Sequence, residues 1–562
     1  MVRFSDYEYQ RPSMEQIEKS FASALTLFKQ AETIQEQVNA IKHTNQVQNT
    51  FYTMLKLCMI RHTIDTTDEF YGKEQEFFDE TEPQMEKLGA EYYTELVNSQ
   101  FRPQLEEILG EQLFNLAELQ LRTFSDDIVP DLQRENKLSS EYGKLLASAN
   151  IMFKGEELTL AQLQAFLTNP NRPVRKQAHQ AFFGFFAAKE AELDRIFADL
   201  VKVRTDIARK LGYENYVELG YHRMDRIGYD SKQVSNFRRQ VQEYIVPLAA
   251  KLREQQSKRI GVDKLKYYDE EYKFTDGNPK PQGSSEWIIQ QAGKMYQSLS
   301  PETDEFFQLM VDRGLMDLVS KKNKAPGGYC TLIEDYKSPF IFANFNGTKG
   351  DIDALTHEMG HAFQKYLSSD FEIREYYFPT SEMAEVHAMG MEFFTWPWMD
   401  SFFGASTDKY KFAHLSHGIL FLPYCISVDE FQHWVYENPE VSSQERKEAW
   451  RAIENKYQPW KDYDGMEYLE QGGFWQKQGH IYQDPFYYID YGIAHVLAFQ
   501  FWVRAQNDWD TAWSQYVHLC KLGGSKPFLE LLKAADLASP FEESCFADIA
   551  DLAEDWLEKA KI

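Results

Sequence analysis

The chain has 562 residues, of which 43% are hydrophobic and 26% charged, a composition typical of a globular protein with a large core. Its formal net charge of −27 would repel nucleic-acid phosphates and anionic membrane surfaces, so we expect neither as a partner. The N-terminus lacks the apolar core of a signal peptide and no run approaches about 18 apolar residues, so we predict a cytoplasmic protein.

Helical periodicity dominates the first half of the chain. Apolar and charged residues recur at helical intervals in the segments 14–60, 68–98, 103–122, 158–168, 173–210 and 232–260. Proline-containing breaks such as 168–173 separate these segments, and 276–283 is the clearest loop. We therefore predict a mainly α fold.

Two arginines, Arg223 and Arg226, lie just before the last of these helical segments. A guanidinium group can bind a carboxylate through two hydrogen bonds, so this pair could meet the carboxylate of a ligand. Ion pairs on a helix surface are the commoner explanation for such residues, and we prefer it.

The sequence changes character after residue 320. Two short runs at 327–333 and 339–345 are rich in aromatic and β-branched residues and are bounded by Gly, Pro and Asn. Such runs are typical of strands. We therefore predict a small β-sheet in an otherwise helical protein.

His357-Glu358-Met359-Gly360-His361 is the most informative motif of the chain. On a helix, His357 and His361 lie one turn apart on one face and can both bind one tetrahedral metal ion, whereas Glu358 can reach a metal-bound water. The alternative is a pair of buried histidines that fall four residues apart by chance. Helical spacing of the surrounding apolar residues supports the helix; these are Leu355, Met359, Ala362, Phe363, Tyr366 and Leu367.

Catalytic zinc usually takes three protein ligands, so a third is needed. Gln364 and Leu367 stand where a Gly-x-x-His continuation of the motif would place its glycine and its histidine. The nearest second helix is predicted at 381–394, where Glu385 and Glu392 are seven residues apart and share a face. One of them can bind the metal while the other hydrogen-bonds a ligand histidine.

Glu382 and His387, in the same segment, are rival third ligands. His387 follows Glu385 by two residues, so it points to nearly the opposite face of the helix and is better explained as a core or surface histidine.

The order and spacing of these residues resemble the thimet oligopeptidase and neurolysin family of zinc peptidases. The resemblance implies one Zn²⁺ per chain with His357, His361 and Glu385 as ligands, Glu358 as the general base, and Glu392 as a hydrogen-bonding partner of a ligand. It also implies a neurolysin-like, two-lobed helical fold that encloses a deep channel. An N-terminal helical lobe at about residues 1–200 would form part of the channel wall, and residues 201–562 would form the catalytic zinc-peptidase lobe. Co²⁺ or Mn²⁺ could occupy the same ligand set.

The runs Gly327-Gly328-Tyr329-Cys330 and Asn344-Phe345-Asn346-Gly347-Thr348 are similar to the oligoendopeptidase F branch of this family, the Pz-peptidase-like enzymes. An extended peptide can add to the edge of a sheet beside the metal helix and be held by its backbone. We therefore predict that Ala343, Asn344 and Phe345 bind substrate, although a purely structural hairpin fits the same residues.

One histidine and four tyrosines lie between residues 479 and 492. A phenol or imidazole beside the metal can stabilise the oxyanion formed when a peptide bond is attacked. The family has a histidine followed by a tyrosine-rich segment that closes over the substrate, which implies catalytic roles for His480, Tyr488 and Tyr491. The register leaves Tyr487 open as a substrate contact or as the catalytic phenol, and any single tyrosine could instead be a packing residue.

Five scattered cysteines without a Cys-x-x-Cys pair favour a reducing compartment. Motifs for nucleotide binding and for a serine nucleophile are absent.

Together, the metal motif and the family resemblance predict a zinc oligoendopeptidase that hydrolyses internal bonds of oligopeptides. Two alternatives stay open: a zinc exopeptidase of the carboxypeptidase or dipeptidase type, and a non-catalytic peptide-binding protein.

Overall fold

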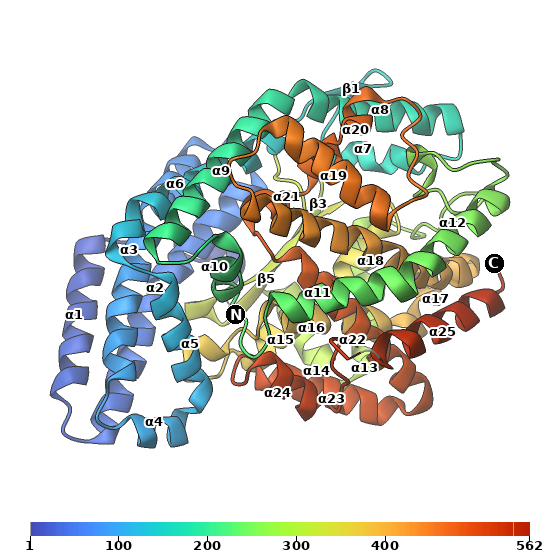
Figure 1. Ribbon diagram of the computed structural model, residues 1–562. Coiled ribbons are helices and arrows are strands. Elements are labelled where there is room, and N and C mark those ends of the chain that lie inside the picture. Colours follow the sequence, from blue (N-terminus) through green and yellow to red (C-terminus); the bar gives the residue numbers. More distant parts are fainter. Residues whose placement is uncertain (1, 543) are drawn as a thin grey trace.

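The structure is a computed structural model that describes residues 2–542 and 544–562. Helices form most of it, and the described strands make one three-stranded and one two-stranded sheet (Figure 1). The prediction of a mainly α fold with a small sheet is confirmed. No helix in the described ranges is both long and apolar enough to cross a membrane.

The N-terminal helices form one end of the molecule, drawn in blue in Figure 1. They are α1 (Met14–Gln30), α2 (Ile34–Ile64), α3 (Glu69–Val97), α4 (Arg102–Leu109) and α5 (Glu111–Thr123). Two predicted helices are each divided. Thr33 caps the start of α2 with its side chain, which ends the first segment near residue 30, and Gly110 takes φ +91° between α4 and α5.

A long middle segment extends from the blue end across the top of Figure 1. It contains α6 (Val129–Ala147), a hairpin of β1 (Ile151–Phe153) and β2 (Glu156–Leu158), α7 (Leu160–Leu167), α8 (Arg172–Ala188), α9 (Glu190–Lys210) and α10 (Tyr216–Arg223). Helix α6 and the hairpin are absent from the sequence predictions. The predicted helix 232–260 is α11 (Ser231–Gln240) and α12 (Val246–Ile260), joined by the π-helical turn Val241–Ile245.

The three-stranded sheet has the order β3-β5-β4. Strands β4 (Tyr329–Ile333) and β5 (Ser338–Phe345) are the two predicted strands and pair antiparallel, with Tyr329 opposite Phe342. The third strand, β3 (Met316–Val319), pairs parallel to β5 and is too short to show a clear alternation in the sequence. As a result β5 is the central strand and β4 is an edge strand.

The C-terminal half is helical around this sheet. Before the sheet lie α13 (Ser285–Leu299) and α14 (Pro301–Asp312). After it come α15 (Gly350–Ser368), α16 (Ser381–Phe394), α17 (Asp400–Phe403), α18 (Thr407–Glu437), α19 (Ser443–Tyr457), α20 (Glu467–Glu470), α21 (Gly479–Gln483), α22 (Tyr488–Asn507), α23 (Trp509–Leu522), α24 (Phe528–Ala534) and α25 (Ser544–Lys559). The predicted helix 381–394 is therefore confirmed with its bounds.

Two apolar cores are present. The smaller one is formed by α1–α5, and Ile373 and Tyr376 pack into it. The larger one extends from Tyr7 through α6–α25 and contains the sheet. Helices α6–α9 thus share their core with the C-terminal half, and the predicted lobe boundary near residue 200 stays a prediction.

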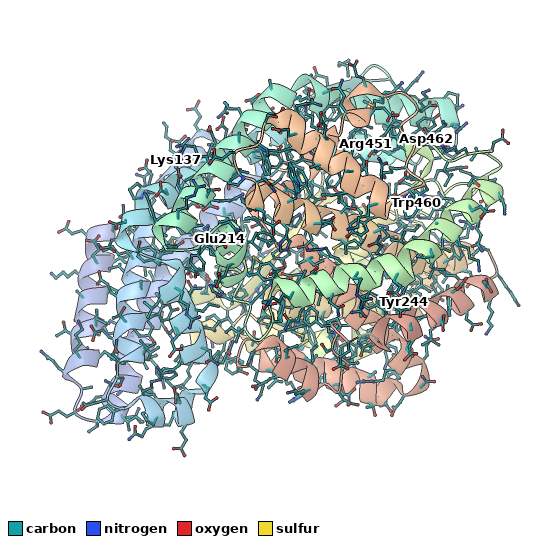
Figure 2. The ribbon with its side chains drawn as sticks, viewed as in Figure 1. Lys137, Glu214, Tyr244, Arg451, Trp460 and Asp462 are labelled. Atoms are coloured by element: carbon teal, nitrogen blue, oxygen red, sulfur yellow. The ribbon has the colours of Figure 1, made fainter. Side chains whose placement is uncertain are left out.

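The outer face of the helices is strongly polar. Figure 2 labels Lys137 on α6, which pairs with Glu80 of α3 at 2.8 Å, with half of each side chain exposed. Exposed pairs of this kind contribute about 0–1 kcal/mol to stability. Stability must therefore come mainly from the two cores and from the buried ion pairs described below.

Candidate active site

Three ligand atoms converge between α15 and α16. His357 and His361 extend from one face of α15, and their ring centroids are 5.0 Å apart. Glu385 of α16 lies opposite, with Oε2 3.2 Å from Nε2 of His357 and 3.5 Å from Nε2 of His361. Among the described residues this is the one cluster of three or more metal-ligand side chains, with all three atoms within 4.8 Å of one another.

These distances fit a tetrahedral metal centre. Ligand atoms at about 2.0–2.1 Å from a zinc ion in tetrahedral geometry lie about 3.3 Å from one another. Oε2 of Glu385 is buried and accepts no hydrogen bond from the protein, so its lone pairs are free for a cation. The donor set of two imidazoles and one carboxylate therefore suits Zn²⁺ in both geometry and chemistry.

Gly360, inside the motif, allows the two helices to approach. A Cβ atom at this position would lie 2.5 Å from the carbonyl oxygen of His387 and 2.7 Å from Cα of Ala388. Both are main-chain atoms of α16 and cannot move aside without displacing the helix. The absence of a side chain at Gly360 thus sets the helix spacing that lets Glu385 reach the histidines.

Glu392 orients the first ligand histidine. Its Oε1 accepts a hydrogen bond from Nδ1 of His357 at 2.8 Å, and its Oε2 accepts one from Nε2 of His414 at 2.6 Å. Trp396 donates its indole N–H to Nδ1 of His414 at 3.2 Å, which fixes the proton of His414 on Nε2. A neutral His357 that donates its Nδ1 proton to Glu392 has an unprotonated Nε2. This nitrogen faces the metal position and can bind a metal ion.

Sequence reasoning missed His414. It lies on α18, in an apolar stretch twenty residues after the end of α16, and no motif marks it. Its contact with Glu392 depends on how α18 packs against α16, which the sequence pattern does not specify.

The electrostatics of the three ligands match metal binding. Burial lowers the pKa of His361 to about 4, so this imidazole is neutral at neutral pH. Burial alone would raise the pKa of Glu385, but His361 and His357 outweigh it and hold the carboxyl group ionised. Burial opposes a charge on His357, yet the close carboxylate of Glu385 and the hydrogen bond to Glu392 raise its pKa well above the usual range in the metal-free protein. In the metal-free protein, a proton on His357 therefore balances the negative charges of Glu385 and Glu392. A bound metal cation would replace this proton.

Glu358 is buried beside the metal ligands. Its Oε2 has no hydrogen-bond partner in the protein, and its Oε1 lies 3.3 Å from the position that a Cβ of Gly328 would occupy. Burial raises the pKa of Glu358 to about 7, and the neighbouring His357 opposes the rise. A carboxylate with a pKa near neutrality is suited to accept a proton and return it.

The predicted downstream cluster does reach this site. Tyr487 at the start of α22 donates its hydroxyl to Oε1 of Glu385 at 2.5 Å. His480 of α21 lies within 3.1 Å of the hydroxyl of Tyr491 through Nε2, and the ring centroids of Tyr491 and His357 are 6.5 Å apart. The ring of Tyr488 packs against Tyr424, and its hydroxyl forms no hydrogen bond with a described residue.

The hydrogen-bond direction distinguishes the tyrosines. The amide of Gln478 donates to Nδ1 of His480 at 2.8 Å, so His480 carries its proton on Nε2 and donates it to Tyr491. The hydroxyl proton of Tyr491 is then free for another acceptor. That of Tyr487 is committed to Glu385.

The remaining predicted residues are displaced from the metal centre. His387 is fully buried, and burial lowers its pKa to about 3, as expected for a core histidine. Glu382 is also fully buried and is not among the clustered ligand atoms. Arg223 pairs with Glu135 at 2.9 Å and Arg226 with Asp490 at 2.7 Å. Both arginines are thus engaged in ion pairs, and that of Arg226 is buried rather than on a helix surface.

Ala343, Asn344 and Phe345 lie on the central strand, not on the free edge. Ala343 and Phe345 are buried, and the side-chain amide of Asn344 donates to the carbonyls of Ala325 and Gly327, both at 2.9 Å. The strand edge beside Glu358 is instead the start of β4, at Gly328. That Ala343–Phe345 bind substrate stays a prediction.

Comparisons with known proteins agree with this arrangement. Residues 4–124 match the model of the peptidase M3 N-terminal domain, and residues 165–550 match that of peptidase family M3. A curated relative, an oligoendopeptidase F homologue of Mycoplasma genitalium, is 21% identical over 411 residues, which cover 68% of this chain and 65% of the relative. The chain therefore spans slightly less than two thirds of that relative's length.

Solved structures match along the whole chain. Pz peptidase A, solved with an inhibitor, is 57% identical with a TM-score of 0.98, and the match covers 99% of both chains. A protein described as an oligoendopeptidase F from Bacillus anthracis strain Ames is 54% identical with a TM-score of 0.94, covering 99% of this chain and 98% of the other.

Proposed function

Since the chain belongs to peptidase family M3, we propose that it is a zinc-dependent oligoendopeptidase that hydrolyses internal bonds of short peptides. The observation that carries the proposal is the convergence of His357, His361 and Glu385 beside the buried carboxylate of Glu358. Bound there, Zn²⁺ would supply a Lewis acid for the scissile carbonyl and lower the pKa of a water molecule.

Protein side chains carry out proton transfer, oxyanion stabilisation and orientation of the metal ligand. Glu358 accepts the proton of the attacking water and passes it to the leaving amine. The hydroxyl of Tyr491 donates a hydrogen bond to the oxyanion. His480 donates its Nε2 proton to the oxygen of this hydroxyl and so orients it. Tyr487 acts through Glu385. Its hydroxyl donates a hydrogen bond to Oε1 of Glu385, and this orients Oε2 toward the metal position. Tyr488 and the residues Ala343–Phe345 are left as contacts to more distant parts of the peptide.

The substrate backbone would be held at the edge of β4. No backbone hydrogen bond of Tyr329–Ile333 to a described residue outside the sheet is present, so the outer edge is free to pair with an extended chain. This edge begins at Gly328, next to Glu358. Pairing through main-chain groups would give affinity with little dependence on side chains, as an enzyme for mixed oligopeptides needs.

We propose that the site lies in an internal space rather than on the outer surface. His417 of α18, one turn after His414, is solvent-exposed, yet burial among protein atoms lowers its pKa to about 3. A solvent-accessible group that is also surrounded by protein atoms supports an interior recess at this point. We infer that this interior is the substrate channel, with the lobe 1–200 in its wall, and that it admits oligopeptides and excludes folded proteins.

A set of end-blocked peptides tests the endopeptidase assignment. Peptides of about ten residues with both termini free, with an acetylated N-terminus, with an amidated C-terminus, or with both ends blocked are incubated with zinc-loaded protein, and the products are identified by mass. We expect cleavage at the same internal bonds in all of them.

Cleavage only of peptides with a free terminus would favour the exopeptidase alternative instead. Absence of turnover in a zinc-loaded protein that still binds peptides would favour the non-catalytic alternative. Elemental analysis of the purified protein shows whether the metal is Zn²⁺, Co²⁺ or Mn²⁺.

The five cysteines are all free thiols. Free thiols persist in a reducing compartment. We therefore propose the cytoplasm as the place of action, where oligopeptides are the expected partners and the net charge of −27 disfavours nucleic acids.

A further inference from the structure

The turn before α22 carries much of the predicted catalytic apparatus. Between α21 and α22 the chain reverses so that His480, Tyr487 and Tyr491 all face the metal ligands. Phe486, in this turn, takes φ +68°, a left-handed conformation that is unfavourable for a residue other than glycine. Other contacts must hold the turn in this shape.

Both main-chain groups of Phe486 are held by side chains from other helices. Its carbonyl accepts a hydrogen bond from Nη2 of Arg226 at 2.6 Å, and its N–H donates to Oε1 of Gln432 at 2.9 Å. Its ring lies over Gly220, where a Cβ would come within 2.5 Å of a ring carbon. Phe486 is therefore fixed from three sides.

Arg226 also binds the helix that follows the turn. The same Nη2 donates to Oδ1 of Asp490 at 2.7 Å, and both side chains are fully buried. Asp490 is on the first turn of α22, directly between Tyr487 and Tyr491 in sequence. One guanidinium nitrogen thus ties the strained turn to the helix start that carries both tyrosines.

The charge of Arg226 also acts on the helix of the third ligand. Glu382 is buried on α16 one turn before Glu385, and both of its carboxylate oxygens lack a hydrogen-bond partner. Burial raises the pKa of Glu382, and the positive charge of Arg226 opposes the rise. Arg226 is therefore ion-paired with the buried carboxylate on the helix of Tyr487, and its charge also acts on the buried carboxylate on the helix of Glu385.

We propose that Arg226 is a positioning residue that holds the Phe486–Asp490 turn, and through it keeps the hydroxyl of Tyr487 on Glu385 and that of Tyr491 on His480. The inference rests on the proposed peptidase function, but it concerns contacts that exist without metal. Arg226 touches neither the metal ligands nor the substrate position, and its effect is transmitted by Phe486 and Asp490.

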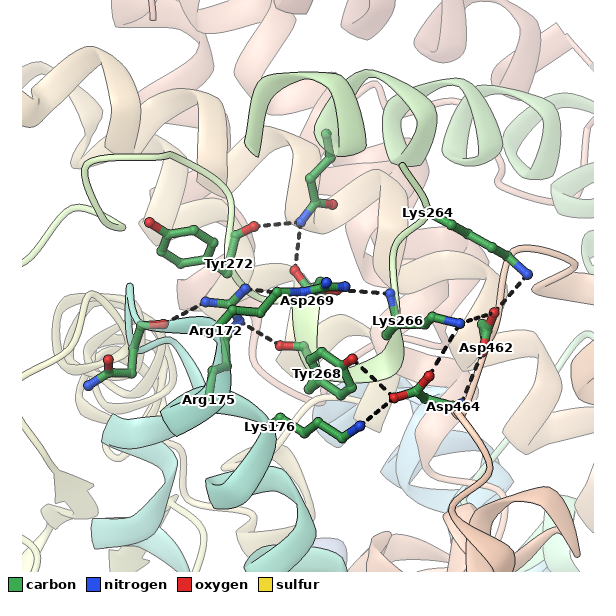
Figure 3. Close-up of polar contacts among 12 residues, drawn as sticks. Arg172, Arg175, Lys176, Lys264, Lys266, Tyr268, Asp269, Tyr272, Asp462 and Asp464 are labelled. Atoms are coloured by element: carbon green, nitrogen blue, oxygen red, sulfur yellow. Dashed lines mark hydrogen bonds and ion pairs between the residues drawn. The ribbon is translucent and has the colours of Figure 1, made fainter. Parts of the chain in front are cut away.

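A second buried arginine provides a matched control. Arg175 of α8 donates to the buried carboxylate of Asp269 at 2.7 Å and to the carbonyl of Tyr268 at 2.8 Å, as Arg226 donates to one carboxylate and one carbonyl. Figure 3 shows this network, in which Arg172 also binds Asp269. None of its members contacts the metal ligands.

The test compares Arg226→Met and Arg226→Lys with Arg175→Met. At saturating zinc, we expect Arg226→Met to lower kcat by about 100-fold with KM changed less than about threefold, because Tyr491 acts on the transition state rather than on ground-state binding. Arg226→Lys keeps the charge and should regain about tenfold in kcat. Arg175→Met should lower Tm to a similar extent while kcat stays within about threefold of wild type.

A crystal structure of metal-free Arg226→Met supplies a readout that does not depend on activity. The 2.5 Å contact between Tyr487 and Glu385 should be lost in Arg226→Met and kept in Arg175→Met. If Arg226→Met does not fold, Asp490→Asn, which changes no volume, replaces it in both measurements with the same expectations. Retention of the contact, or a kcat no lower than that of Arg175→Met, would overturn the proposal. If the wild-type protein has no peptidase activity, the proposed function fails while the crystallographic comparison still decides the inference.

Discussion

Glu358 is the residue on which the proposed chemistry depends most directly. Its side chain is buried next to the ligands but is not one of them. We predict that Glu358→Gln retains one zinc ion per chain and loses activity by about 10²–10⁴-fold, the range typical of a lost general base. Zinc content and kcat measured on one preparation check this. Unchanged activity would remove Glu358 from the mechanism.

Tyr487 and Tyr491 have different hydrogen-bond partners, and so should have different mutant phenotypes. Tyr491→Phe removes the oxyanion donor, and we expect kcat to fall by about 10²–10³-fold with zinc affinity unchanged. Tyr487→Phe frees Oε1 of Glu385, and we expect zinc affinity to weaken by about 10–100-fold. Zinc titration with a competing chelator and steady-state kinetics separate the two. Equal effects of both variants on both quantities would contradict the assignment.

The sequence predicted the His/His/Glu cluster but not everything that orients it. Helical periodicity predicts that His357 and His361 lie together, because i and i+4 positions on a helix are neighbours wherever the helix packs. Glu385 was predicted only through the family resemblance, with Glu382 and His387 as rivals. His414 and Arg226 act on the site through contacts between helices whose relative placement no local pattern specifies. For the same reason, Ala343–Phe345 could be predicted as a strand, but not that β3 would pair with it and make it central.

At the scale of elements, the contact of α15 with α16 is controlled by Gly360. We predict that Gly360→Ala lowers the free energy of unfolding by about 1–3 kcal/mol and weakens zinc binding, because a Cβ would push against the main chain at His387 and Ala388. Chemical denaturation with and without zinc measures both effects.

Gly184 of α8 is the matched control for this substitution. It is also inside a helix, but a Cβ there would meet no atom within 4 Å. Gly184→Ala should therefore stabilise the protein by up to about 1 kcal/mol through helix propensity alone. If both alanine variants behave alike, the helix spacing argument is wrong.

The elements were predicted best where capping side chains mark their ends. Ser13, Asp68 and Thr159 each accept a main-chain N–H at the start of a predicted helix. Helix α6 has no such cap: its N-cap is Ile128, and a 3₁₀ turn at Asp126–Ile128 runs into it. Its start therefore depends on packing against α3 and α9, which the sequence does not display.

At the scale of the whole molecule, buried ion pairs join segments that are distant in sequence. Glu135 of α6 binds Arg204 of α9 at 2.6 Å and Arg223 of α10 at 2.9 Å. Burial alone would raise its pKa, but the two arginines lower it to about 2. A carboxyl group with a depressed pKa stabilises the fold above its unfolded value of 4.5, and this contribution is lost as the pH falls toward 2.

We predict that metal-free Glu135→Gln is destabilised at pH 7 by about 3–5 kcal/mol, because the buried Arg204 and the partly buried Arg223 lose their counter-charge. Its unfolding free energy should also fall less steeply than that of wild type between about pH 5 and pH 3. Urea denaturation at several pH values measures both. Glu80→Gln, which breaks the exposed pair with Lys137, should keep the wild-type slope. If the unfolding free energies of wild type and Glu135→Gln fall with the same slope as the pH is lowered, this carboxylate does not determine the loss of stability in acid.

The active site is assembled from segments that a ribosome produces at different times. His357 and Glu385 are separated by fewer than thirty residues, but Glu385 meets Tyr487 across 102 residues of sequence. At about 5–20 residues per second, several seconds pass between emergence of the ligand helices and emergence of the turn at Phe486. Until the turn at Phe486 has emerged, an unfinished chain lacks the tyrosines that the proposed mechanism needs beside the metal ligands.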